Sequence, residues 1–151
     1  MTVSTVIKTP FLAVKSHLSG NVHEVDAGQL YRSAQLKPKQ LAYYTRKYGI
    51  KSIINLRGAN PDKKWWQLEK SFSEKMSILH YDIPMSACVL TSKENLLTLL
   101  CLYKEAPRPI LIHCQGGADR TGEAAALWKL EQQSCSKKEA LEQLALRYGH
   151  F

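Results

Sequence analysis

Short apolar runs alternate along this chain with longer segments in which apolar residues recur every three or four positions. Three of the runs are KSIINL at 51–56, SILHYDI at 77–83 and ILIHC at 110–114. The run at 110–114 lacks polar alternation, which is typical of a central strand covered on both faces. NVHEV and QLYRS flank Asp26-Ala27-Gly28, a turn signal that predicts a hairpin or a bent pair of strands.

The segments between the runs carry helical spacing. Pro38 predicts a helix start, and Gly49 stands where a left-handed C-terminal cap would be. A second helix is predicted from Asn60-Pro61-Asp62. The apolar face of the first contains Leu41, Tyr44 and Tyr48, and that of the second contains Trp65, Leu68 and Phe72.

Three more helices are predicted in the second half of the chain. Thr91 and Glu94 have the spacing of a capping box, and so do Ser136 and Glu139. Between these two helices, residues 120–133 predict another that begins directly after a glycine-containing loop. The expected core positions of the first and last helices are Leu96, Leu99, Leu100 and Tyr103, and Leu141, Leu144, Ala145 and Tyr148.

This alternation of strands and helices predicts an α/β fold with a mostly parallel sheet of four or five strands, flanked by helices. The chain has 151 residues, of which 44% are hydrophobic, and it contains no internal repeat and no linker rich in glycine and serine. A chain of this length is expected to form one domain over residues 1–151.

Composition narrows the function classes only a little. Lys and Arg outnumber Asp and Glu by 21 to 13, and the resulting charge of +8 favours an anionic ligand. No apolar stretch is long enough to span a membrane or to form a secretory signal core in residues 1–18, so we expect a cytoplasmic protein, or a periplasmic or secreted one if a signal peptide has been removed. The four cysteines form no C-x-x-C pair, which predicts neither a zinc site nor a disulfide framework.

The most informative stretch is HCQGGADRTG at 113–122, which lies between a predicted buried strand and the start of a helix. In open α/β sheets ligands bind at this position, where loop N–H groups and the helix dipole attract an oxyanion. Gly116 and Gly117 allow close approach of the backbone through positive φ, and Arg120 can grip two phosphate oxygens. Cys114 near a helix N-terminus and an arginine is expected to favour its nucleophilic thiolate.

This stretch resembles the H-C-x-x-G-x-x-R-[ST] phosphate loop of the cysteine-dependent protein tyrosine and dual-specificity phosphatase superfamily. LYRSAQL at 30–36 and SIINLRG at 52–58 also look like the early part of small bacterial dual-specificity-like phosphatases. The resemblance implies hydrolysis of a phosphomonoester through a cysteinyl-phosphate, without metal or cofactor. Thr121 would hydrogen-bond the sulfur and His113 would support the loop. The residues expected to bind phosphate are Gln115, Gly116, Gly117, Ala118, Asp119 and Arg120.

The general acid of this superfamily is an aspartate from an earlier loop, and this chain departs from that pattern. The corresponding position falls near Ser86-Ala87-Cys88, where no carboxylate stands. Asp119 and Asp82 remain as candidates, with Asp119 slightly favoured because a subset of bacterial phosphatases, some acting on phosphoinositides, has an aspartate there. That subset usually carries a lysine where this chain has Ala118, which argues against a lipid substrate.

Two arginines outside the loop have two interpretations each. Arg32 and Arg57 either add positive charge to the pocket or pair with a carboxylate across the sheet. A substrate role is the less favoured interpretation for both.

Three function classes compete at this point. The leading hypothesis is a phosphatase acting on a phosphorylated substrate, most simply a phosphoprotein, with an inositol phosphate or phosphoinositide as the alternative. A phosphate-binding pseudophosphatase is favoured only by the unfilled acid position. A nucleic-acid surface built on the basic charge and on aromatic residues is not expected, since no RNA-binding signature is present. Those aromatic residues are Tyr43, Tyr44, Trp65 and Trp66.

Overall fold

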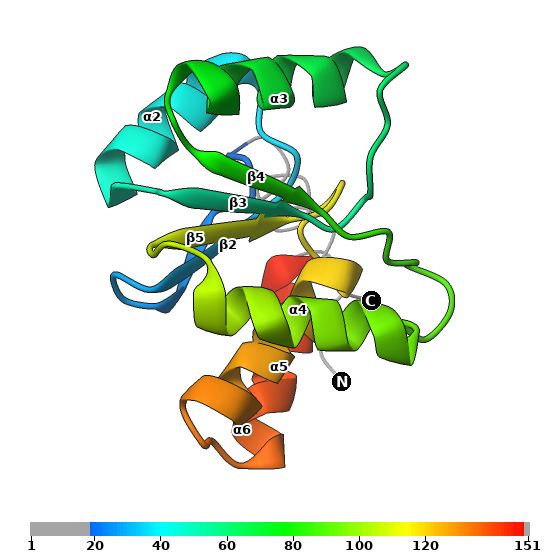
Figure 1. Cartoon of the computed structure of the whole chain (residues 1–151). Coiled ribbons are helices and arrows are strands. Elements are labelled where there is room, and N and C mark those ends of the chain that lie inside the picture. The colour runs from blue at the N-terminus through cyan, green and yellow to red at the C-terminus, as the bar shows by residue number, and fades with distance from the viewer. Residues whose placement is uncertain (1–18, 150–151) are drawn as a thin grey trace, which may run out of the picture.

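The computed structural model describes residues 19–149, so the prediction about a signal core in residues 1–18 falls outside the described part. A five-stranded sheet with the order β1-β2-β5-β3-β4 forms its centre (Figure 1). β1 pairs antiparallel with β2, and all other neighbouring strands are parallel. The strands are β1 (His23–Asp26), β2 (Leu30–Ser33), β3 (Ser52–Asn55), β4 (Leu79–Asp82) and β5 (Ile110–His113). The predicted α/β fold with a mostly parallel sheet is therefore confirmed.

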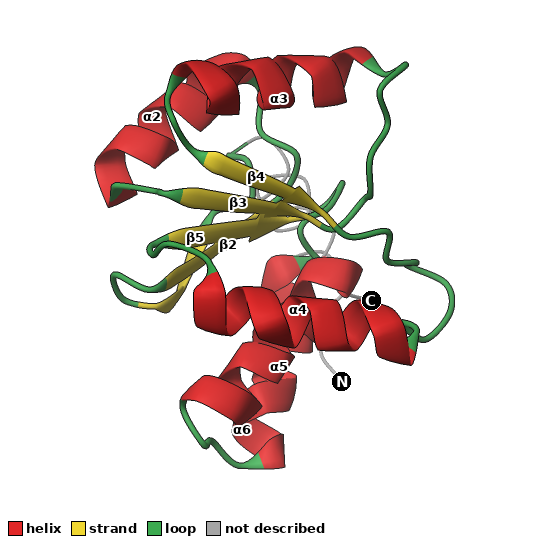
Figure 2. Ribbon diagram, in the orientation of Figure 1, coloured by secondary structure: helices red, strands yellow, loops and turns green. Residues whose placement is uncertain are grey.

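Helices cover both faces of the sheet (Figure 2). α2 and α3 lie on one face, and α4, α5 and α6 lie on the other. The helices are α2 (Pro38–Tyr48), α3 (Lys64–Lys75), α4 (Lys93–Glu105), α5 (Asp119–Gln132) and α6 (Lys137–Leu141), followed by the 3-10 turns η1 (Glu142–Leu144) and η2 (Leu146–Tyr148). No helix within residues 19–149 has the length and apolar character that crossing a membrane requires.

The central strand β5 separates two hydrophobic cores. Ile110 and Ile112 point toward α4 and α5, and they join a cluster that includes the fully buried Trp128. Leu111 points the other way and packs with Leu41 of α2. Alternate side chains of one strand thus bury themselves on opposite faces, which explains why the run at 110–114 has no polar alternation. Because β5 is the central strand, its C-terminal end lies in the middle of one edge of the sheet. The glycine-containing loop begins at this end.

The predicted start of the second helix is wrong, and its predicted apolar face is right only in part, because Phe72 packs against the core but Leu68 does not. Residues 60–63 form a turn, and α3 begins at Lys64 instead of at Asn60-Pro61-Asp62. Leu68 is 44% exposed, whereas Glu69 and Ser73 are buried. The helix is rotated so that the Glu69 carboxylate faces the sheet, where the side chains of His80 and His113 bind it.

Two other details differ from the predicted helix ends. Ser92, not Thr91, caps α4 by accepting a hydrogen bond from the Asn95 N–H. The capping box of Ser136 and Glu139 is present, but the continuous final helix is not. After α6 the chain tightens into two 3-10 turns that bury Gln143 and Tyr148 against the rest of the fold.

Candidate active site

The loop that contains Cys114 connects the C-terminal end of β5 to the N-terminus of α5, as the sequence predicts. Neighbouring strands hold its start in place: the Leu56 N–H donates to the His113 carbonyl, and the Gln35 N–H donates to the Gln115 carbonyl. A pocket of about 330 Å³ opens over the loop. Its lining residues are Ala87, Cys114, Gln115, Gly116, Ala118, Asp119 and Arg120. Five of the six residues expected to bind phosphate therefore line one pocket with the thiol.

The Cys114 side chain lies at the base of this pocket, where the residue is 3% exposed. Burial by itself would raise the pKa of the Cys114 thiol. The polar groups of Thr121, the charge of Arg120 and a hydrogen bond from the Gly117 N–H outweigh burial, so the net pKa is lowered. The Gly117 nitrogen lies 3.2 Å from the sulfur. The surroundings of Cys114 therefore favour the nucleophilic thiolate.

Arg120 begins α5 together with Asp119, so the helix dipole and the guanidinium act on the same space. The Nε of Arg120 is buried and has no hydrogen-bond partner among residues 19–149. A buried N–H of a charged group is costly unless an acceptor reaches it. Arg120 also lines the pocket, so a tetrahedral oxyanion bound there would lie beside its guanidinium.

The conformation of the loop depends on Gly117 more than on Gly116. Gly117 has φ of 72°, and Gly116 is not in the positive-φ region, so the prediction that both glycines use it holds for Gly117 alone. A Cβ on Gly117 would lie 2.6 Å from the Ala34 nitrogen and 2.6 Å from the Ser33 carbonyl carbon. These are backbone atoms of the chain at the end of β2, which cannot move aside as a flexible side chain can.

We expect Gly117→Ala to destabilise the protein by about 3 kcal/mol, because it combines an unfavourable φ with a clash against backbone. Gly28→Ala is the matched control: Gly28 has φ of 70°, but nothing lies within 4 Å of its added Cβ. Urea unfolding should show a loss of only about 1 kcal/mol for the control. Equal losses in the two variants would contradict the close packing of the loop against β2.

Arg32 supports the loop from beneath and pairs with no carboxylate of residues 19–149. Its Nη2 donates to the carbonyls of Gly117 at 2.8 Å and Ala118 at 3.4 Å, and its Nη1 donates to the carbonyl and side-chain oxygens of Gln143. The guanidinium also lies 3.8 Å from the ring centre of Tyr148. In place of the carboxylate partner that the sequence offered as one interpretation, Arg32 binds backbone carbonyls, and this buried cation joins the loop to the C-terminal turns.

Arg57 lies beside the loop but is held by other side chains. Its guanidinium stacks 3.6 Å from the ring centre of Trp65 and donates to the Gln35 side-chain oxygen at 3.1 Å. Burial lowers its pKa first, and the nearby charge of Arg120 lowers it further. Arg57 thus adds positive charge near the pocket without lining it.

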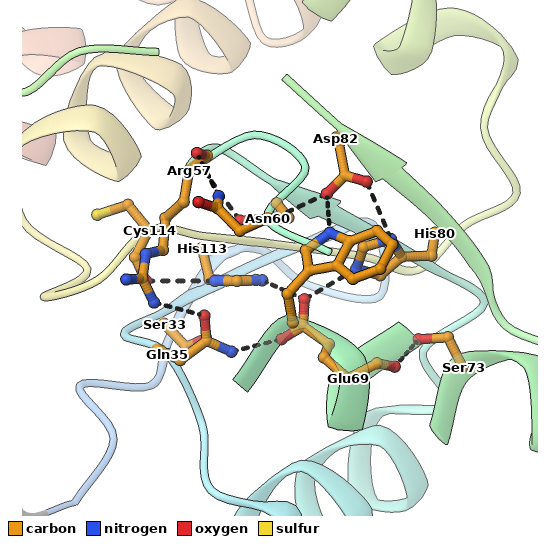
Figure 3. A network of polar contacts seen from close by, with 12 residues as sticks. Ser33, Gln35, Arg57, Asn60, Glu69, Ser73, His80, Asp82, His113 and Cys114 are labelled. Atoms are coloured by element: carbon orange, nitrogen blue, oxygen red, sulfur yellow. Dashed lines mark hydrogen bonds and ion pairs between the residues drawn. The ribbon is translucent and has the colours of Figure 1, made fainter. Parts of the chain in front are cut away.

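Glu69 is a residue of this site that the sequence reasoning missed. Its carboxylate accepts hydrogen bonds from His113, His80 and Gln35 directly behind the loop (Figure 3). One signal was available: Glu69 stands four positions after Trp65 and three before Phe72, on the predicted apolar face of the helix. A charged residue at such a position indicates a buried partner.

The two candidate acids occupy different surroundings. Asp119 lines the pocket with Cys114 and Arg120. Asp82 lies on the other side of the polar network from Cys114 (Figure 3), where its Oδ1 accepts hydrogen bonds from Asn55 at 2.7 Å and from the Trp66 indole at 3.0 Å. These bonds give Asp82 a structural role between β4, β3 and α3.

Comparison with known proteins agrees with this geometry. A family model described as a dual-specificity and tyrosine phosphatase fused to NAD⁺ kinase matches residues 7–150. The chain belongs to this family. Among curated proteins, no sequence matches the chain. Membership makes it a relative of the cysteine-based tyrosine and dual-specificity phosphatases.

Solved structures of such phosphatases share the fold. TpbA of P. aeruginosa, in a cysteine-to-serine variant bound to phosphotyrosine, is 25% identical with a TM-score of 0.65, and the match covers 87% of this chain and 76% of that one. The core catalytic domain of the PP-IP phosphatase SIW14 from S. cerevisiae, solved with citrate, is 26% identical with a TM-score of 0.63, and the match covers 85% and 82% of the two chains. The Tk-PTP structure is 23% identical with a TM-score of 0.67, and the match covers 82% of this chain and 79% of that one.

Proposed function

We propose that this phosphatase-family chain is a metal-independent phosphomonoester hydrolase, formed by a single domain, that acts through a cysteinyl-phosphate on Cys114. The observation that carries the proposal is the pocket in which a thiol of lowered pKa lies beside Arg120 and the loop. A pure binding site would not need a thiolate, which weighs against the pseudophosphatase alternative.

The reaction has two steps. The Cys114 thiolate attacks phosphorus, the bond from phosphorus to the leaving oxygen breaks, and a proton from the general acid neutralises that oxygen. Arg120 and the loop N–H groups stabilise the charge on the equatorial oxygens of the transferring group. Water then attacks the cysteinyl-phosphate, gives its proton to the same carboxylate, and releases phosphate and the thiolate. Hydrogen bonds from Thr121 stabilise the sulfur as it leaves.

We assign the general acid to Asp119 in preference to Asp82. Asp119 shares the pocket with the nucleophile, whereas both Asn55 and Trp66 hold one carboxylate oxygen of Asp82. An acid must reach the leaving oxygen within hydrogen-bond distance, and geometry therefore takes precedence over sequence position.

The substrate that we propose is a phosphoprotein, of which the site binds one phosphorylated residue at a time. The pocket over the loop adjoins a second pocket of about 400 Å³ that shares Ala87, Asp119 and Arg120 with it and contains the exposed Val89 and Leu90. Among the described residues that line the two pockets, Arg120 is the cation, and Asp119 and Glu123 are anions. A densely phosphorylated inositol would need more positive charge than this, whereas a phosphotyrosine, as bound by the TpbA variant, would contact the apolar wall.

The test is hydrolysis of p-nitrophenyl phosphate by the full chain in the presence of a metal chelator. We expect turnover that chelation does not change, and a phosphate adduct on the Cys114 peptide after rapid acid quenching. A phosphotyrosine peptide should be hydrolysed with a higher kcat/KM than an inositol polyphosphate. Binding of orthovanadate without any turnover would favour the pseudophosphatase instead.

Two aspartate variants test which residue is the general acid. Asp119→Asn should lower kcat by about 10²- to 10³-fold and remove the decline of activity at high pH, because an amide has no proton to lose. Asp82→Asn should keep that decline and instead lower the melting temperature, since it disturbs the bonds from Asn55 and Trp66. The reverse pattern in the pH profiles of kcat would assign the acid to Asp82.

A further inference from the structure

A buried carboxylate lies behind the phosphate loop, residues 114–120, on the face of the sheet covered by α3. The side chain of Glu69 is 2% exposed, and its Oε1 accepts hydrogen bonds from His113 Nε2 at 2.8 Å and from His80 Nε2 at 2.9 Å. Its Oε2 accepts a bond from the Gln35 side chain at 2.7 Å (Figure 3). A charge removed from water to this extent needs a compensating cation.

His113 is the group that provides this cation. Its Nε2 faces the Glu69 carboxylate, and its Nδ1 faces the backbone oxygen of Cys114 at 3.2 Å. Carboxylate and carbonyl oxygens only accept hydrogen bonds, so both ring nitrogens must carry a proton for both bonds to form. The ring that satisfies both contacts is an imidazolium.

Electrostatics agree with this assignment. Burial alone would lower the pKa of His113, but the charge and hydrogen bond of Glu69, with the bond to the Cys114 carbonyl, raise it overall. Burial would likewise raise the pKa of Glu69, but the charge and hydrogen bond of His113, together with those of His80, hold that pKa well below its usual range. His80 also faces this cluster: its Nε2 binds Glu69 Oε1 at 2.9 Å, and its Nδ1 lies 3.8 Å from the Asp82 Oδ2 on the far side from the loop.

The imidazolium lies next to the reacting thiol. His113 precedes Cys114 in the chain, and interaction with the Cys114 sulfur contributes to raising the pKa of His113. The other charges near the sulfur are Arg120 of the loop, Arg57 beside it and Arg32 beneath it. The Glu69 carboxylate lies behind the His113 ring that it binds, and the Asp82 carboxylate lies farther away, against His80.

We propose that Glu69 is a positioning residue that holds His113 as an imidazolium against the back of the phosphate loop, where its charge favours the Cys114 thiolate. This deepens the proposed function and rests on it, because the charge matters to catalysis only if Cys114 is the nucleophile. The same carboxylate orients Gln35, whose side-chain oxygen accepts the bond from Arg57. Glu69 therefore positions two cations, the His113 imidazolium behind the loop and, through Gln35, the Arg57 guanidinium beside it.

The first experiment measures the thiolate directly and needs no turnover. Iodoacetamide labelling of the Cys114 peptide in the full chain is followed by mass spectrometry across pH, with the exposed Cys101 as internal reference. Glu69→Gln should move the Cys114 inflection upward by on the order of one pH unit. His113→Asn should move the Cys114 inflection further upward, since this change removes the imidazolium and leaves the Glu69 carboxylate in place. Glu74→Gln, an exposed position of the same helix, should move nothing.

An inflection unchanged in a folded Glu69→Gln variant would overturn the proposal, and so would an equal shift in Glu74→Gln. The second experiment uses the unaltered chain, so that it decides the matter even if Glu69→Gln fails to fold. The ¹⁵N chemical shifts of the His113 ring should report two protonated nitrogens at pH 7. One unprotonated ring nitrogen at that pH would also overturn the proposal.

These outcomes are distinguishable from failure of the proposed function. If the chain hydrolyses no phosphomonoester, the labelling and the ring shifts still report whether Glu69 controls His113 and the thiol. If hydrolysis proceeds but Glu69→Gln leaves both the inflection and the acidic limb of kcat/KM unchanged, the phosphatase assignment stands and the role of Glu69 is wrong.

Discussion

Replacing Cys114 with serine should abolish hydrolysis of p-nitrophenyl phosphate, with a loss of kcat on the order of 10⁴-fold or more. The serine hydroxyl is not ionised near neutral pH, and in the proposed mechanism Asp119 carries its proton during the first step, so it cannot act as the base for the hydroxyl. His113 cannot serve, because both of its ring nitrogens are engaged with Glu69 and the Cys114 carbonyl. Steady-state assays and trapping of the phosphorylated peptide measure the two consequences.

The control separates loss of chemistry from loss of the site. Cys101→Ser changes an exposed thiol on α4 in the same way and should leave kcat unaltered. Cys114→Ser should still bind inorganic phosphate, since Arg120 and the loop N–H groups remain. Residual turnover of Cys114→Ser within tenfold of the wild type would contradict a covalent mechanism on this residue.

Arg32→Met should destabilise the protein by about 3 kcal/mol or more, although Arg32 touches no substrate in the proposed mechanism. Methionine keeps much of the apolar stem but leaves the carbonyls of Gly117, Ala118 and Gln143 without their donor. Burial lowers the pKa of Arg32 to about 10, so the guanidinium remains charged at neutral pH. For a chain of this size the melting temperature should fall by about 10 °C.

Arg46→Met is the matched control, because Arg46 is exposed near the end of α2 and the same charge is lost there. Urea unfolding should show a change of less than about 0.5 kcal/mol for it. Arg32→Met should also weaken orthovanadate binding, since the loop loses its support from below. Equal stability of the two variants would show that the bonds from Arg32 to the loop contribute little.

The loop and its surroundings could be predicted because their signals are local. A buried strand, a cysteine, two glycines and an arginine follow each other within eleven residues, and the chemistry of an oxyanion site depends on that order. The position of the loop between β5 and α5 follows from the same stretch. The cap at Gly49 and the hairpin turn at Asp26-Ala27-Gly28 were predicted for the same reason, since turn and cap preferences act over a few residues.

The sequence alone determined the α/β alternation, the phosphate loop and the thiol at its base. Only the tertiary structure decided that Glu69 faces His113, that Arg32 binds the underside of the loop, and that Asp82 is tied to Asn55 and Trp66. These contacts join residues 16 to 85 positions apart, and those of Glu69 and Trp66 also depend on how α3 is rotated against the sheet. Burial of a charge is a property of the assembled fold, because the partners that make it tolerable come from other elements.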